Sequence, residues 1–186
     1  MKNFFIIILV LLSLNDFGAR AQRWALSTNV PDYVALGTLN IRGDAGVSQH
    51  WSVNSSMKYN PWTFHAGDIE SQMENRQLTI AAAARYWPWN VFSGWWVESG
   101  LQYQEYNRGG ISKPETEEGD AFGLKLAAGY TLMLYKNFNV DFGLGLWGGS
   151  KIFKVYDCPS CGRIKDRGTK GFVRPNELIV ALAYIF

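Results

Sequence analysis

The residues best suited to chemistry in this sequence are Cys158 and Cys161, which form a Cys-x-x-Cys pair. Such a pair serves as a redox motif, as half of a zinc site or as a local disulfide. Thioredoxin-type redox motifs occupy a strand-to-helix junction, and the surrounding residues do not predict one. A structural zinc site needs about four ligands, so the two cysteines with His65 are one short unless Asp157 or a second chain contributes. We expect a disulfide between Cys158 and Cys161, with a metal site as the alternative.

Other signatures of catalysis are not found in the sequence. It has no nucleophile elbow, no phosphate-binding glycine loop and no metalloprotease helix. We therefore expect a protein that is not an enzyme and that has no catalytic residues, no cofactor and no resident metal. The formal net charge of +2 is too small to indicate a basic surface for nucleic acid, so nucleic acid is not an expected partner.

Any site would have to be positioned by short stretches in which apolar and polar residues alternate. From Gln22 onward, apolar and polar residues fall on opposite sides of eight stretches with the period of two that is typical of β-strands. Each stretch is close to the roughly 9–11 residues that a tilted membrane-spanning strand needs. The expected strands cover residues 24–30, 39–48, 51–59, 76–87, 92–103, 121–133, 138–147 and 178–186.

The connections between these stretches alternate between short and long. Short turns are expected at 49–50, 88–91 and 134–137, and long loops at 31–38, 60–75, 104–120 and 148–174. Short turns at one end and long loops at the other are typical of outer-membrane β-barrels, in which the long loops face outside the cell. The pattern predicts an all-β fold: an eight-stranded antiparallel transmembrane β-barrel with short periplasmic turns and long extracellular loops. An even number of strands leaves both termini in the periplasm.

Charged residues of both signs fall on the inward side of the expected strands. An eight-stranded barrel is just wide enough for side chains to fill, and an unpaired buried charge is very costly. We expect the four cations and four anions to form a paired network, while a path for protons or solutes through them is the alternative. The residues are Arg42, Asp44, Lys58, Arg85, Glu98, Lys125, Asp141 and Glu177.

The last nine residues form the clearest of the alternating runs. Its outward side ends in a terminal aromatic residue and comprises Leu178, Val180, Leu182, Tyr184 and Phe186. An exposed apolar edge strand of this kind would be an aggregation hazard in a soluble protein. The stretch resembles the carboxy-terminal insertion signal of bacterial outer-membrane barrels, which the barrel-assembly machinery reads.

The amino terminus has the features of an export signal. Lys2 is followed by an apolar stretch from Phe4 to Leu14, which is too short to span a bilayer comfortably, and then by the small-x-small sequence Ala19-Arg20-Ala21. We expect residues 1–21 to be a cleaved signal peptide and residues 22–186 to be the outer-membrane domain. Export also places the two cysteines in an oxidising compartment.

Several motifs together resemble one known family. They are Tyr59-Asn60-Pro61-Trp62, Arg85-Tyr86-Trp87, the Cys158-x-x-Cys161-Gly162 segment and the terminal Tyr184-Ile185-Phe186. With these motifs the chain resembles the DUF3575 family, small outer-membrane barrels of Bacteroidetes whose function is unknown. The resemblance implies an outer-membrane location and an association with surface fimbrial components, and it supplies no catalytic residues.

These observations lead to one functional expectation and two alternatives. We expect a structural or surface-interaction protein in the outer membrane of a Gram-negative cell envelope. Its partners would be membrane lipid, the barrel-assembly machinery and a surface or fimbrial protein. The alternatives are a narrow channel for small solutes or ions and a lipid-modifying barrel enzyme, for which His65 is the candidate base.

Overall fold

A computed structural model describes residues 24–65, 72–110, 115–157 and 163–186. The expected signal peptide, residues 1–21, and the Cys158–Cys161 pair lie outside the described residues. Within them, nine strands form one antiparallel sheet, and a short helix follows the first strand. The elements are β1 (Trp24–Asn29), α2 (Val30–Val34), β2 (Leu39–Gly46), β3 (Trp51–Asn60), β4 (Thr63–Phe64), β5 (Met73–Tyr86), β6 (Gly94–Gly109), β7 (Thr116–Tyr135), β8 (Phe138–Tyr156) and β9 (Ile164–Ile185).

Eight of these strands close into a ring. Each strand pairs with its neighbour in the chain except that β3 pairs with β5, and β4 only adds a short pairing to β5. The ring closes where β1 meets β9, with Ala25 opposite Ile185. The main-chain amide of Trp24 donates to the carbonyl of Phe186 at 3.1 Å, and the reverse bond is 2.8 Å. Closure gives the apolar last strand a hydrogen-bonded partner on each side at this end.

Alternation along the strands exposes one set of side chains outside the ring and buries the other set inside it. At the end of the chain, Leu178, Leu182, Tyr184 and Phe186 are exposed, whereas the intervening Ile179, Ala181, Ala183 and Ile185 are buried. The same pattern runs through β6 and β7. The sides expected from the sequence for this last stretch agree with the structure.

The strands are longer than the alternating apolar runs predict. The expected loops at 104–120 and 148–174 are wrong over the described residues, because β6 continues to Gly109, β7 begins at Thr116, β8 continues to Tyr156 and β9 begins at Ile164. Polar residues occupy both faces there, so hydrophobic periodicity does not reveal the strands, although their main chains remain paired. A register shift after Gly145 accommodates Pro175 within β9.

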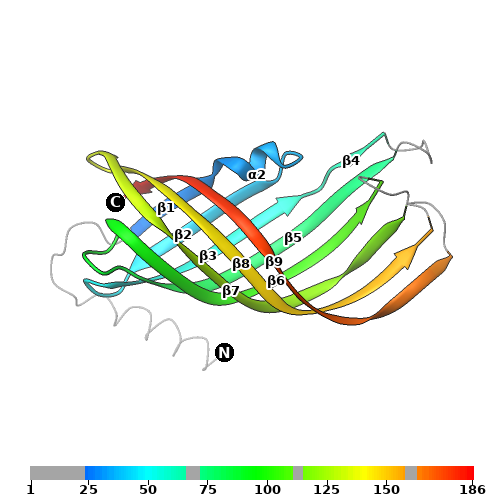
Figure 1. Cartoon of the computed structure of the whole chain (residues 1–186). Coiled ribbons are helices and arrows are strands. Elements are labelled where there is room, and N and C mark those ends of the chain that lie inside the picture. The colour runs from blue at the N-terminus through cyan, green and yellow to red at the C-terminus, as the bar shows by residue number, and fades with distance from the viewer. Residues whose placement is uncertain (1–23, 66–71, 111–114, 158–162) are drawn as a thin grey trace, which may run out of the picture.

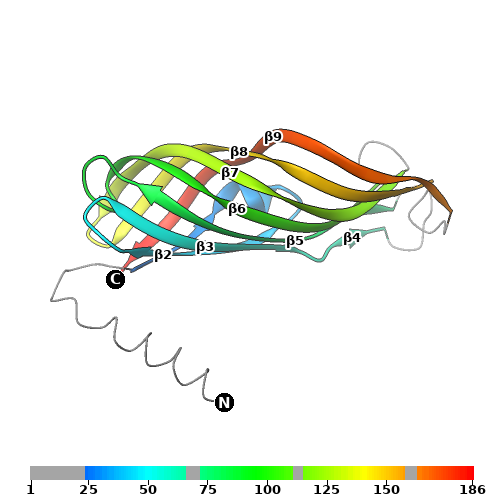
Figure 2. The same cartoon turned by 90° about the horizontal axis from the view of Figure 1, so that it is seen from below.

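Because β1 and β2 are short, the side of the ring that they form extends less far along the strand direction than the other sides do. β9 pairs with β1 only from Ala181 to Ile185, although β9 itself begins at Ile164. Beyond that level β5 to β9 continue as an open curved sheet, which projects away from the end that holds the carboxy terminus (Figures 1 and 2). We call this part of the sheet the extension.

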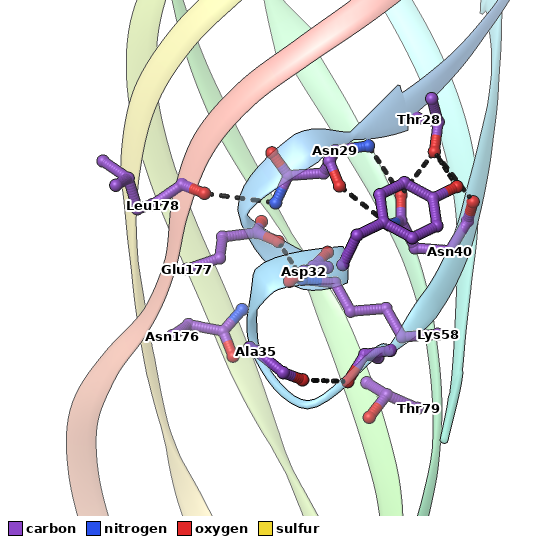
Figure 3. A network of polar contacts seen from close by, with 12 residues as sticks. Thr28, Asn29, Asp32, Ala35, Asn40, Lys58, Thr79, Asn176, Glu177 and Leu178 are labelled. Carbon is purple, nitrogen blue, oxygen red and sulfur yellow. Dashed lines mark hydrogen bonds and ion pairs between the residues drawn. The ribbon is translucent and has the colours of Figure 1, made fainter. Parts of the chain in front are cut away.

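Helix α2 and the side chain of Asn29 close the gap where β1 ends. The Asn29 side chain replaces a strand pairing, because its Nδ2 donates to the Leu178 carbonyl at 3.1 Å and its Oδ1 accepts from the Val180 amide at 2.9 Å. Asn40 holds Asn29 from the other side through hydrogen bonds to the Asn29 main chain (Figure 3). The expected loop at 31–38 therefore contains a helical turn, with Pro31 at its start.

The Tyr59-Asn60-Pro61-Trp62 motif fastens the loop after α2 to the end of β3. Asn60 is fully buried and donates to the Leu36 carbonyl and the Thr38 hydroxyl at 3.0 and 2.9 Å. The Trp62 indole donates to the carbonyl of Gly37, whose φ of +70° favours glycine. The motif thus has a structural role in the described chain.

No helix in the described ranges is long and apolar enough to cross a membrane.

Replacing Asn29 by alanine should destabilise the junction between β1 and β9. Asn29 is 8% exposed, and the change leaves the Leu178 carbonyl and the Val180 amide without their side-chain partner. We expect the free energy of unfolding to fall by about 1–3 kcal/mol in urea titrations. Asn90→Ala is the control, because Asn90 is exposed in a turn and should change stability by less than about 0.5 kcal/mol. Equal effects of the two changes would contradict the assigned role.

Candidate functional site

The interior of the ring holds a continuous network of ion pairs. Seven strands contribute to it, because each carries a charged residue on its inward side. All eight charged residues that the sequence places inside take part: Arg42 and Asp44 from β2, Lys58 from β3, Arg85 from β5, Glu98 from β6, Lys125 from β7, Asp141 from β8 and Glu177 from β9. The network therefore ties together strands on all sides of the ring.

Glu98 is the centre of this network. Its side chain is 0% exposed and forms ion pairs with three cations. Arg42 Nη2 and Arg85 Nε donate to Glu98 Oε2 at 2.6 and 2.9 Å, and Lys125 Nζ lies 3.3 Å from Oε1. Charge-assisted hydrogen bonds from β2 and β5, together with the ion pair to Lys125 of β7, offset the cost of burying this carboxylate.

Two of these cations contact further carboxylates, Arg42 within its own strand and Arg85 across the interior of the ring. Arg42 forms a forked contact with Asp44, in which both nitrogen–oxygen distances are 2.9 Å. Arg85 Nη1 donates to Asp141 Oδ2 at 2.8 Å, and the Thr131 hydroxyl donates to the other oxygen at 2.6 Å. Planar guanidinium groups suit such shared and forked geometry better than ammonium groups do.

The lysine side of the network reaches helix α2. Lys125 and Lys58 pair with opposite oxygens of Glu177 at 2.5 and 2.7 Å. Lys58 also lies 2.9 Å from Asp32, which stands in the first turn of α2 and points toward the ring interior (Figure 3). The sequence reasoning missed Asp32 because it fell in an expected loop. Pro31 followed by an acidic residue is the helix-start signal that would have found it.

Aromatic side chains hold Arg85 in place. Its guanidinium carbon lies 3.7 Å from the ring centroid of Trp96 and 5.3 Å from that of Trp87. Both tryptophans are 1% exposed, and the Trp87 indole donates to the Ser52 hydroxyl at 2.9 Å. The sequence reasoning did not place either tryptophan inside. Alternation would have indicated Trp96, because its neighbour Trp95 faces outward.

A small cavity adjoins the lysine side of the network. A cavity of about 30 Å³ lies between Lys58, Lys125, Glu177 and the neighbouring strands. That is close to the space of one water molecule. Two apolar clusters, one including Trp96 and the other including Trp147, pack against the interior on either side of Glu98. The geometry suits a filled core that locks the strands together.

A larger hollow of about 530 Å³ lies against β3, β5, β6, β7 and β8, and none of the network residues lines it. Two of the carboxylates that line it have partners, since the Tyr103 hydroxyl donates to Asp120 at 2.5 Å and Glu118 accepts from the Tyr156 hydroxyl at 2.7 Å. The third, Glu105, is exposed on the outward side of β6.

The other candidate residues are not brought together. His65 is exposed, and within the described ranges no group of three or more His, Cys, Asp or Glu side chains is arranged to hold a metal ion. The expected disulfide between Cys158 and Cys161 stays a prediction, since both residues lie outside the described part.

The fold and the network define a class of protein: a closed antiparallel ring of eight strands with apolar side chains outside and paired charges inside. The chain belongs to the DUF3575 family, described as a protein family of unknown function, whose sequence profile matches residues 4–186. No curated protein matches the chain significantly.

Replacing Glu98 by glutamine should strongly destabilise the ring. The amide keeps the size of the side chain but leaves the charges of Arg42, Arg85 and Lys125 without their shared anion. Removing one partner of a buried ion pair costs about 3–5 kcal/mol, which should appear as a lower urea midpoint in tryptophan fluorescence. Glu105→Gln is the matched control on the exposed side of β6 and should stay within about 0.5 kcal/mol of the original protein. If both variants unfold at the same urea concentration, the network does not stabilise the ring.

Proposed function

We propose that this protein is an outer-membrane β-barrel that acts as a structural or surface-interaction protein. The observation that carries the proposal is the apolar outer surface of the ring. Large hydrophobic side chains are exposed on every long strand, including Leu101 at 55%, Leu126 at 47%, Leu144 at 68% and Leu182 at 51%. A continuous apolar band of this kind is unfavourable in water and favourable against lipid. Closure of the ring also satisfies the main chain, which lipid requires.

Aromatic residues support the proposed bilayer position. At the end that holds the carboxy terminus, outward aromatic side chains pair across strands, with ring centroids 5.1 Å apart for Trp51 and Tyr86 and 5.3 Å apart for Trp95 and Tyr130. The contact between Phe138 and Tyr184 on β8 and β9 is similar, at 5.0 Å. Aromatic girdles at the membrane–water interface are typical of transmembrane barrels.

The filled interior favours a structural role over a conducting one. Any solute would have to pass Glu98 and the three cations bound to it, and the adjacent cavity of about 30 Å³ does not form a path. A channel would require this network to open. We therefore favour the structural and surface-interaction role over a channel.

The orientation that we propose follows from the two ends of the ring. The turns between β2 and β3, between β5 and β6 and between β7 and β8 lie at the same end as the carboxy terminus (Figure 1). In outer-membrane barrels this is the periplasmic end. The extension would then project outside the cell, where it can meet a surface protein, fimbrial or other.

A charge in the apolar band should impair membrane insertion. Leu144→Arg places a cation on the outer face of β8, where we expect a cost of about 2–4 kcal/mol near the bilayer midplane and a reduced amount of protein in the outer-membrane fraction. Ile152→Arg is the matched control, because Ile152 lies on the same face of β8, is 63% exposed and faces Asp120 beyond the band. Fractionation of a Gram-negative host with immunoblotting measures both. Recovery of the original protein in the soluble fraction would contradict the proposal.

A further inference from the structure

We infer that the inner face of the extension binds an anionic group, with Arg108 of β6 and Arg174 of β9 as the recognising side chains. This face is continuous with the ring interior but lies beyond the level where β1 and β2 end. The assignment goes beyond the proposed function, since binding by the purified protein does not depend on the membrane that holds the ring.

The guanidinium groups of Arg108 and Arg174 donate hydrogen bonds to neutral amide side chains. Arg174 Nη2 donates to Gln104 Oε1 at 2.7 Å, Gln104 Nε2 donates to Gln77 Oε1 at 2.8 Å, and Arg108 Nη2 donates to the same oxygen of Gln77. Among the described residues, neither arginine forms an ion pair with a carboxylate. This contrasts with the arginines of the ring interior, which each contact two carboxylates.

Donor groups on this face remain unused. Arg108 Nε is buried and has no hydrogen-bond partner. The indole nitrogen of Trp147, a residue that is 1% exposed, is also without a partner. Buried donors without acceptors are rare in proteins, and each requires an explanation such as a bound ion or ligand. An oxyanion would supply the acceptor oxygens that these groups lack.

The nearby carboxylate, that of Glu117, already has a hydrogen-bond partner and an ion-pair partner. Glu117 Oε1 accepts from the Tyr106 hydroxyl at 2.6 Å and pairs with Lys151 at 2.5 Å. Lys151 lies directly opposite Lys170 across β8 and β9, and like charges in that position repel. Asp166, further along β9, is exposed and accepts a hydrogen bond from the Arg167 amide.

The charge balance of the face is therefore positive. The face carries two arginines, two lysines and two carboxylates, those of Glu117 and Asp166. Among the described residues, only Glu117 forms an ion pair with any of these four cations. Burial, followed by the charge of Arg174, lowers the pKa of Arg108. An anion between the two arginines would offset this repulsion.

Aromatic side chains orient the arginines. The Arg174 guanidinium carbon lies 4.8 Å from the centroid of Trp147 and 5.3 Å from that of Phe172, and the two aromatic rings pack edge to face. The Arg108 guanidinium carbon is 5.7 Å from the Tyr106 ring. Stacking fixes the plane of a guanidinium group and leaves its in-plane N–H donors available, which suits phosphate and carboxylate oxygens.

The ligand class is thus a phosphate or carboxylate group. It can belong to a soluble molecule that enters the extension or to the headgroup of a lipid. Inorganic pyrophosphate is a suitable soluble probe, and nanodiscs of phosphatidylglycerol compared with phosphatidylcholine test the lipid source. Arginine is preferred to lysine for such forked recognition, so Arg174→Lys should weaken binding although it keeps the charge.

Calorimetry on the purified full chain tests the inference. We expect saturable binding of pyrophosphate that weakens with salt and falls at least about tenfold in the Arg108→Gln/Arg174→Gln double variant. The Arg76→Gln/Arg167→Gln double variant removes the same charge from exposed positions of β5 and β9 and should bind like the original protein. Circular dichroism checks that each variant is folded.

The outcomes separate the sources of the anion. Arginine-dependent binding to phosphatidylglycerol nanodiscs without binding to pyrophosphate would assign the site to a lipid headgroup. Binding of neither probe, or equal loss in the two double variants, would overturn the inference. Failure of the protein to enter a membrane would count against the proposed function but would leave the pyrophosphate result unaffected.

Discussion

The structure depends on one buried carboxylate. Glu98 has no access to solvent and would be very unfavourable alone, yet three cations from β2, β5 and β7 contact it. Those cations in turn engage Asp44, Asp141 and Glu177, so a single connected set of charges spans the ring. A filled polar core of this kind fixes the register of the strands, since a slip by one residue would turn each charge toward the outer face.

The same alternation that buries the charges exposes the apolar side chains. Each strand therefore contributes both to a sealed interior and to an outer band that suits lipid. Where β1 and β2 end, Asn29 and the first turn of α2 complete the ring, and Asp32 joins the network there. The remaining strands continue into the extension, where Arg108 and Arg174 have no ion pair among the described residues, whereas each cation of the ring network has at least one. The molecule thus combines a closed ring with an open sheet whose inner face holds the proposed anion site.

Sequence periodicity predicts the closed part well and the open part poorly. Every inward charge from Arg42 to Glu177 lies in or next to an apolar alternating run, so its side of the strand can be assigned from its neighbours. Arg108 lies where both faces of a strand are polar, and periodicity treats that segment as a loop. Asp32 lies in a helical turn of five residues, which is too short to show hydrophobic periodicity and is marked only by Pro31 followed by an acidic residue. The signal peptide, the insertion role of the last strand and the Cys158–Cys161 disulfide stay predictions.

Spin-label accessibility can show whether the outer face of the ring meets lipid. A nitroxide at Leu144→Cys, with Cys158 and Cys161 replaced by serine, is compared in lipid vesicles with one at Ile152→Cys on the same face of β8. We expect oxygen, which concentrates in lipid, to relax the label at position 144 more than a water-soluble nickel chelate does, and we expect the reverse at position 152. Greater relaxation by nickel at position 144 would mean that the outer face of the ring does not meet lipid.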